Sequence, residues 1–134
     1  MANPDIVSVT SILGGNAGYN LTATATTTLL TVAADKIVKV NTIMVANVDG
    51  TNAATVDLFV DGMGTGTGGG TTGAVTTGAN ETVYLAKTIS VPADATLSIL
   101  QNPIYLMEGD ILKGGASAAS DLDLFLSFEV LDDG

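Results

Sequence analysis

The chain lacks the side chains on which most enzyme mechanisms depend. Its 134 residues include no cysteine, histidine, tryptophan or arginine. Without cysteine there is neither a disulfide framework nor a thiolate metal site. Without histidine, the commonest general acid–base and the commonest metal ligand are both missing. We therefore expect a protein that is not an enzyme and that holds no cofactor.

Positive charge is also scarce. Four lysines stand against fourteen carboxylates, which gives a net charge of −10. Proteins that bind nucleic acid neutralise its phosphates with lysine and arginine, and anionic membrane surfaces attract basic segments. No apolar run approaches the roughly 20 residues that a membrane-spanning helix needs. We expect neither nucleic acid nor a membrane as a partner.

The N-terminal residues MANPDIVSV do not resemble a secretory signal. They have no basic region followed by an apolar stretch, which is the pattern of a signal peptide. We expect synthesis in a host cytoplasm.

What the chain does contain is typical of β-strands. Threonine and valine are abundant, and both suit a pleated sheet. Between Asp121 and Leu131, alternate positions are apolar, with Phe125 as the exception on the polar face, and the same alternation runs through Ala54–Asp61. Further strands are expected at Asp5–Leu13, Thr26–Val32, Ile37–Asn47, Val83–Val91, Thr96–Gln101, Pro103–Leu106 and Asp110–Lys113.

Turn residues separate these runs at short intervals. Asp49-Gly50-Thr51-Asn52, Pro92-Ala93-Asp94 and Glu108-Gly109-Asp110 are expected turns. About eight short strands at this spacing predict an all-β fold, a single antiparallel β-sandwich of jelly-roll type. Residues 1–16 are expected to form an N-terminal arm with the first strand, and residues 17–134 the sandwich domain.

A glycine-rich stretch, residues 61–80, interrupts the strand pattern. Eight of the eighteen residues from Asp61 to Gly78 are glycine, and the pattern GxGxxG occurs twice. A dinucleotide site needs a helix after the glycines, and a Walker A loop needs a lysine. Neither is present, so we interpret the stretch as a long hairpin loop that could become ordered against a neighbouring molecule.

Carboxylates are the other chemically useful groups. Loop carboxylates and carbonyls can hold calcium, and Asp49, Asn52 and Asp57 are the candidates for such a site, although no EF-hand spacing is present. Paired carboxylates can also serve glycoside hydrolysis, but the chain has no tryptophan to form a sugar platform. The alternative is that these residues form turns and a solvated outer face, where carboxylates protect sheet edges.

Four stretches combine a strand pattern with a turn: residues 40–62 (VNTIMVANVDGTNAATVDLFVDG), 85–100 (LAKTISVPADATLSIL), 103–112 (PIYLMEGDIL) and 116–133 (ASAASDLDLFLSFEVLDD). They resemble small virion structural proteins of tailed bacteriophages, above all those of aquatic phages and cyanophages. The opening MANPDIVSVTSILG fits the same family. These are strand and turn motifs without a catalytic residue. The resemblance therefore implies a β-sandwich protein present in many copies on the virion.

The composition and the resemblance together favour a capsid decoration (cement) protein on the outside of a phage head. Its partners would be the major capsid protein or other virion proteins, and it would act as a homo-oligomer, with a trimer as the first candidate. The candidate contact residues are Asn3, Pro4, Ile6, Val7, Gly64, Thr65, Gly66 and Gly69. Two alternatives stay open: a neck, tail or fibre protein, and a calcium-dependent carbohydrate-binding module for host attachment.

Overall fold

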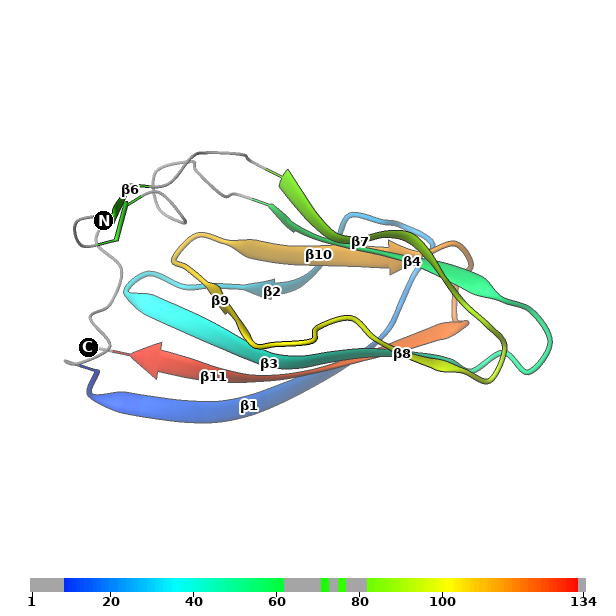
Figure 1. Cartoon of the computed structure of the whole chain (residues 1–134), viewed down its shortest axis with the longest axis horizontal. Coiled ribbons are helices and arrows are strands. Elements are labelled where there is room, and N and C mark those ends of the chain that lie inside the picture. Colours follow the sequence, from blue (N-terminus) through cyan, green and yellow to red (C-terminus); the bar gives the residue numbers. More distant parts are fainter. Residues whose placement is uncertain (1–8, 62–70, 73–74, 77–81, 133–134) are drawn as a thin grey trace.

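The computed structural model describes residues 9–61, 71–72, 75–76 and 82–132. Within these residues the chain forms strands and turns and no helix (Figure 1). The strands are β1 (Ser11–Asn20), β2 (Thr27–Thr31), β3 (Lys36–Asn47), β4 (Ala54–Asp61), β5 (Thr71–Thr72), β6 (Val75–Thr76), β7 (Thr82–Val91), β8 (Thr96–Ser98), β9 (Ile104–Leu106), β10 (Ile111–Ala116) and β11 (Leu122–Asp132).

The strands pair in a nested order. One sheet, here called the β1 sheet, has the order β1-β11-β3-β8, and β9 also pairs with β3. The other, the β2 sheet, has the order β2-β10-β4-β7. Every ladder is antiparallel. The first strand therefore pairs with the last. From β1 towards β8, and from β2 towards β7, each successive pair joins strands that are closer together in the sequence.

Two short strands share one position beside β3. β8 pairs with Met44–Ala46, and β9 pairs with Val38–Val40. The described part of the chain therefore fills eight strand positions in the two sheets with nine strands. The small β5–β6 ladder stands apart from both sheets and lies within the expected glycine-rich hairpin.

One hydrophobic core lies between the two sheets. The β1 sheet contributes fully buried side chains such as Ile43, Leu122, Leu124 and Leu126, and the β2 sheet contributes Val56, Leu58, Val91 and Leu112. Burial of a leucine or valine side chain contributes about 1.5–3 kcal/mol. The inward residues confirm the alternation predicted for Ala54–Asp61 except at Phe59, which is also buried. In Asp121–Leu131 they confirm it as far as Leu126, after which Phe128 and Val130 are only partly buried against the core. The strands and their ladders confirm the all-β class and the antiparallel pairing.

The first strand lies later in the chain than the sequence predicts. The expected strand was Asp5–Leu13, of which residues 5–8 lie outside the described part, whereas β1 runs from Ser11 to Asn20. Glycine has a low strand preference, but β11 offers ten consecutive backbone partners, and this pairing holds Gly14, Gly15 and Gly18 in β1. The boundary placed at residue 16 falls inside β1.

The strand predicted at Val83–Val91 is present as β7, but the alternation of buried and exposed residues breaks in its middle. The ladder with β4 shifts register on either side of Leu58, and Thr88 has a φ of 51°. Because a bulge re-aims the side chains around it, Ala86 is buried while Ile89 is 41% exposed.

Two predicted turns are confirmed. Ala95 N donates to Pro92 O at 3.1 Å, with Asp94 at a φ of 57°. Gly109 has a φ of 88°, a conformation that glycine adopts without a steric cost. This second turn carries the chain from β9 in the β1 sheet to β10 in the β2 sheet.

Candidate functional site

Two of the three predicted calcium residues lie together in one turn. Asp49 Oδ1 accepts a hydrogen bond from Thr51 N at 2.8 Å, and Asp49 Oδ2 accepts one from Asn52 Nδ2 at 3.2 Å. The buried Asn47 side chain secures the same turn, because its Oδ1 accepts from Asp49 N at 2.9 Å. The hydrogen bond from Thr51 N, followed by that from Asn52, lowers the pKa of the Asp49 carboxyl. This arrangement stabilises a turn.

Asp57 takes its partners from a different element. It lies in β4, and its Oδ1 accepts from Thr88 N of β7 at 2.6 Å, while Lys87 Nζ stands 3.8 Å from Oδ2. In the ranges described above, no group of three or more carboxylates is placed to hold a metal ion. Asp57 therefore anchors the β7 bulge to β4.

The predicted contact residues lie outside the part of the chain that the structure describes. They are Asn3, Pro4, Ile6, Val7, Gly64, Thr65, Gly66 and Gly69. The candidate surface must therefore be built from other residues.

A hollow of about 480 Å³ opens on the outer face of the β1 sheet. Four strands supply its lining, which consists of Gly18, Tyr19, Asn20, Met44, Ala46, Thr96, Asp123, Leu124 and Phe125. The small residues Gly18 and Ala46 leave room, and Phe125 and Met44 stand beside them with about two fifths of each side chain exposed. Such a mixture of apolar surface and few polar groups is typical of a contact or binding surface.

One polar pair borders the hollow. Asn20 Nδ2 donates to Asp123 Oδ1 at 2.7 Å across the β1–β11 ladder. Asp123 is the only ionisable group in the lining apart from Tyr19, whose hydroxyl donates to Leu29 O of β2. The hollow thus offers an aromatic side chain, a methionine and one amide–carboxylate pair, and no combination of nucleophile and base.

Exposed apolar side chains extend well beyond the hollow. Eight large ones are 39% to 63% exposed, and they come from both sheets and one loop: Ile12, Leu13, Met44, Val48, Tyr84, Ile89, Tyr105 and Phe125. Scattered exposed apolar residues are normal, but groups of them mark interaction surfaces. Of these residues only Phe125 stands out in the sequence, because it breaks the alternation of its strand. Met44 carries no such signal within its apolar strand.

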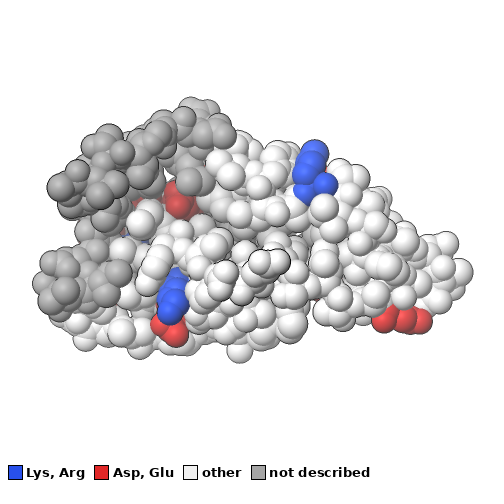
Figure 2. Space-filling view, in the orientation of Figure 1, with Lys and Arg blue, Asp and Glu red and all other residues white. Residues whose placement is uncertain are grey.

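Three of the four lysines stand against carboxylates. Lys36 Nζ lies 2.8 Å from Asp132 Oδ2, and Lys113 Nζ lies 2.9 Å from Asp61 Oδ2. Lys87 Nζ stands 4.7 Å from the centre of the Tyr84 ring. On the part of the face in Figure 2 that belongs to the described residues, charged side chains are few and most of the surface is uncharged. That part is available for uncharged contacts.

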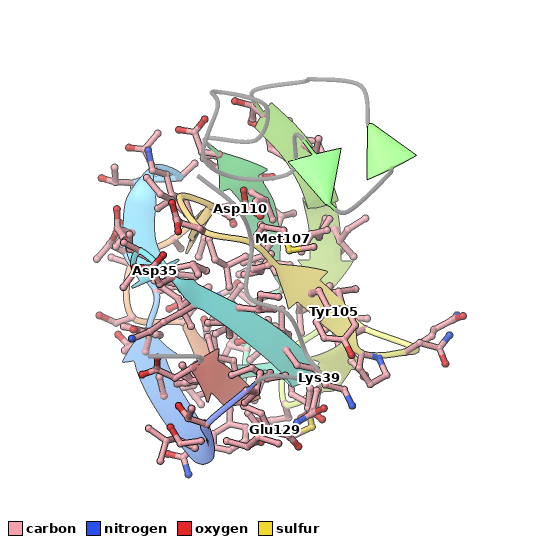
Figure 3. The ribbon with its side chains drawn as sticks, turned by 90° about the vertical axis from the view of Figure 1, so that its left-hand side faces the viewer. Asp35, Lys39, Tyr105, Met107, Asp110 and Glu129 are labelled. Atoms are coloured by element: carbon pink, nitrogen blue, oxygen red, sulfur yellow. The ribbon has the colours of Figure 1, made fainter. Side chains whose placement is uncertain are left out.

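Two buried acids shape the end of the molecule shown in Figure 3. Glu108 Oε2 accepts from Asp35 N at 2.6 Å, and Asp110 Oδ2 accepts from Met107 N at 2.9 Å. Asp110 is 2% exposed, and its Oδ1 has no hydrogen-bond partner among the described residues. Burial raises the pKa of the Asp110 carboxyl. The sequence predicts a turn in this segment, but no local pattern shows that its acids point inward.

No helix in the described residues is long and apolar enough to cross a membrane. No protein-family model and no curated protein matches the chain. Among solved structures, it is similar to a chain from Bacillus endospore appendages, described as a novel family of disulfide-linked pili. The identity is 16%, the TM-score is 0.45, and the match covers 92% of this chain and 90% of the other. At these values the likeness carries no argument about the activity of this chain.

Proposed function

We propose that the chain is a structural subunit of a virion, built as a jelly roll. The nested pairing supports this architecture. β1 pairs with β11, β2 with β10, β3 with β8 and β9, and β4 with β7. In a jelly roll, eight strands wind into two facing sheets by two Greek keys, and viral capsid domains use this arrangement.

Within that class, we propose a capsid decoration protein that binds the outer surface of a phage head. The carrying observation is the set of eight exposed apolar side chains, which spreads over both sheets outside a complete core. The resemblance of four sequence stretches to phage virion proteins favours the same conclusion. The partner is the major capsid protein or a neighbouring virion protein, and the binding unit is a homo-oligomer.

A decoration protein acts by mass action. Binding to the assembled shell and not to its dissociated subunits stabilises the shell by RT ln(1 + [L]/Kd) at each site. The net charge of −10 keeps free copies soluble and apart from the packaged nucleic acid. Uncharged contacts on the sheet faces then supply the attraction to the shell.

Purified protein mixed with heads that lack it tests the proposal. We expect saturable co-sedimentation and a higher temperature of head disruption. Tyr84→Ala alters the β2 sheet and Phe125→Ala the β1 sheet, and both side chains are more than two fifths exposed. Only one face can lie against the shell, so one variant weakens binding and the other is its control. Absence of saturable binding, or binding to tails alone, would remove the decoration proposal.

The hollow favours a second candidate function, a calcium-dependent carbohydrate-binding module for host attachment. The Phe125 side chain and the Asn20–Asp123 pair are groups that a sugar can contact. Titration calorimetry with calcium chloride and with host-cell polysaccharide distinguishes the two functions. Heat that saturates and disappears in Phe125→Ala would favour the module, and the absence of heat would leave the structural role. A neck, tail or fibre position is distinguished from the head by copy number.

A further inference from the structure

β1 forms one edge of its sheet and lacks the usual protection of an edge strand. It pairs with β11 alone in the described part of the chain, and it lies along the lower border of Figure 1. Its ten residues, SILGGNAGYN, include no charged residue and no proline. The register with β11 runs from Ser11 to Asn20 without a shift. A long, regular, uncharged edge strand is a template for pairing with another strand.

The other described edges are blunted in the ways that natural sheets use. β2 has five residues, and its ladder with β10 shifts register. β7 carries Lys87 and the bulge at Thr88. β8 and β9 have three residues each and occupy one interrupted edge. β1 is therefore the exception among the edges of the two sheets.

The free edge of β1 presents a regular set of backbone groups. Leu21 N donates to Leu122 O at 2.8 Å, in register with the ladder that β1 forms with β11. Because hydrogen-bonded pairs alternate along an antiparallel ladder, the odd-numbered residues of β1 bond to β11. The even-numbered residues Ile12, Gly14, Asn16, Gly18 and Asn20 direct their N–H and C=O groups away from it.

The two ends of β1 differ in side-chain size. Ile12 and Leu13, near its start, are 63% and 57% exposed. Ala17 and Gly18, near its end, are small, and Gly18 lines the hollow beside Phe125. A second copy of β1, running antiparallel about an axis at Gly15, sets Ile12 opposite Gly18 and Leu13 opposite Ala17. Each large apolar side chain then meets a small one, and Ile12 of one copy can reach Phe125 of the other copy across Gly18.

We propose that β1 pairs antiparallel with β1 of a second copy about a two-fold axis at Gly15, joining the two β1 sheets into one. A second copy is the favoured occupant because the strand is complementary to itself and uncharged. A basic partner attracted by the net negative charge of the chain would find no carboxylate on β1. The contact is isologous and closes as a dimer. It does not depend on the place of the protein in a virion.

Gly14→Pro tests the contact. An added Cβ at Gly14 meets nothing within 4 Å, and the lost N–H is one of the outward set. Proline is tolerated where the N–H of an edge strand faces solvent. We expect the wild type to dimerise in sedimentation experiments between about 1 μM and about 1 mM. Gly14→Pro should weaken the dimer about 10- to 100-fold, because two symmetry-related hydrogen bonds are lost. Gly14→Ala is the matched control and should still dimerise.

Two further measurements cover the case in which Gly14→Pro fails to fold. Gly14→Cys mixed with Asn16→Cys should form a mixed disulfide under oxidation far faster than either variant alone, since the chain has no other cysteine. In the wild type, amide exchange at Gly14, Asn16 and Gly18 should slow with rising protein concentration. A monomer at all concentrations, or an oligomer that Gly14→Pro leaves intact, would overturn the proposal. Loss of head binding with dimers preserved would instead remove only the virion function.

Discussion

At the scale of single residues, two carboxyls have opposite effects on stability. Hydrogen bonds to Asp49 lower its pKa in the folded protein, so the folded state favours the charged form. Its contribution to the free energy of unfolding is present above the pKa of the unfolded state and is lost as pH falls through the pKa of the folded state. Burial raises the pKa of Asp110, so the folded state favours the protonated form. Its penalty is absent below the unfolded pKa and grows as pH rises through the folded pKa.

Asp49→Asn and Asp110→Asn should therefore respond to pH in opposite directions. Relative to wild type, Asp49→Asn should lose more stability at about pH 7 than at about pH 3. The stability of Asp110→Asn relative to wild type should be higher at about pH 7 than at about pH 3, because the substitution removes the buried charge. Urea unfolding at both pH values measures each difference. Parallel responses of the two variants would contradict these assignments.

At the scale of elements, two glycines set the position of β10. A Cβ on Gly115 would lie 2.3 Å from Thr24 O, and one on Gly114 would lie 2.5 Å from Asp57 O. Both neighbours are backbone atoms, which cannot move away without shifting a strand or loop. These glycines therefore permit the close approach of the loop before β2 and of β4 to β10.

Gly115→Ala should lower the free energy of unfolding by about 1–3 kcal/mol, the usual cost of overpacking. Gly50→Ala is the control, because its nearest side-chain neighbour, Asp94, is at an ordinary contact distance of 3.5 Å. We expect the free energy of unfolding of Gly50→Ala to stay within about 0.5 kcal/mol of the wild-type value. Urea denaturation measures both. Equal stability of Gly115→Ala and wild type would show that the backbone at Thr24 yields.

The same scale shows which elements a sequence can predict. The apolar alternation identified β4 and β11, and the strand expected at Ile37–Asn47 is present as β3. The sequence pattern misplaced β1, because pairing with β11 outweighs the low strand preference of its glycines. The pattern also missed the exposure of Ile89 beside the β7 bulge. Both errors arise where long-range pairing overrides local preference.

The candidate surface was harder to predict than the strands. Phe125 could be recognised from the sequence, because it is an apolar exception on the polar face of an alternating strand. The hollow around it needs four strands from distant parts of the sequence. Likewise, Glu108 and Asp110 were identified as turn residues, but their burial depends on the loops packed against them. Strand order, which creates both features, is not encoded in any local pattern.

At the scale of the whole molecule, the features point to contact with other molecules. The core is shared by two sheets, three of the four lysines stand against carboxylates, and large apolar side chains lie outside the core. The strong negative charge opposes loose self-association. A contact between copies is therefore favoured where charge is absent, as along β1.

The number of copies in purified virions tests the central claim most directly. Quantitative mass spectrometry of intact particles, scaled to the major capsid protein, measures it. We predict copies on the order of hundreds, as expected when a subunit repeats over a symmetric shell. About six or twelve copies would move the protein to the neck or tail, and its absence from particles would contradict a structural role in the virion.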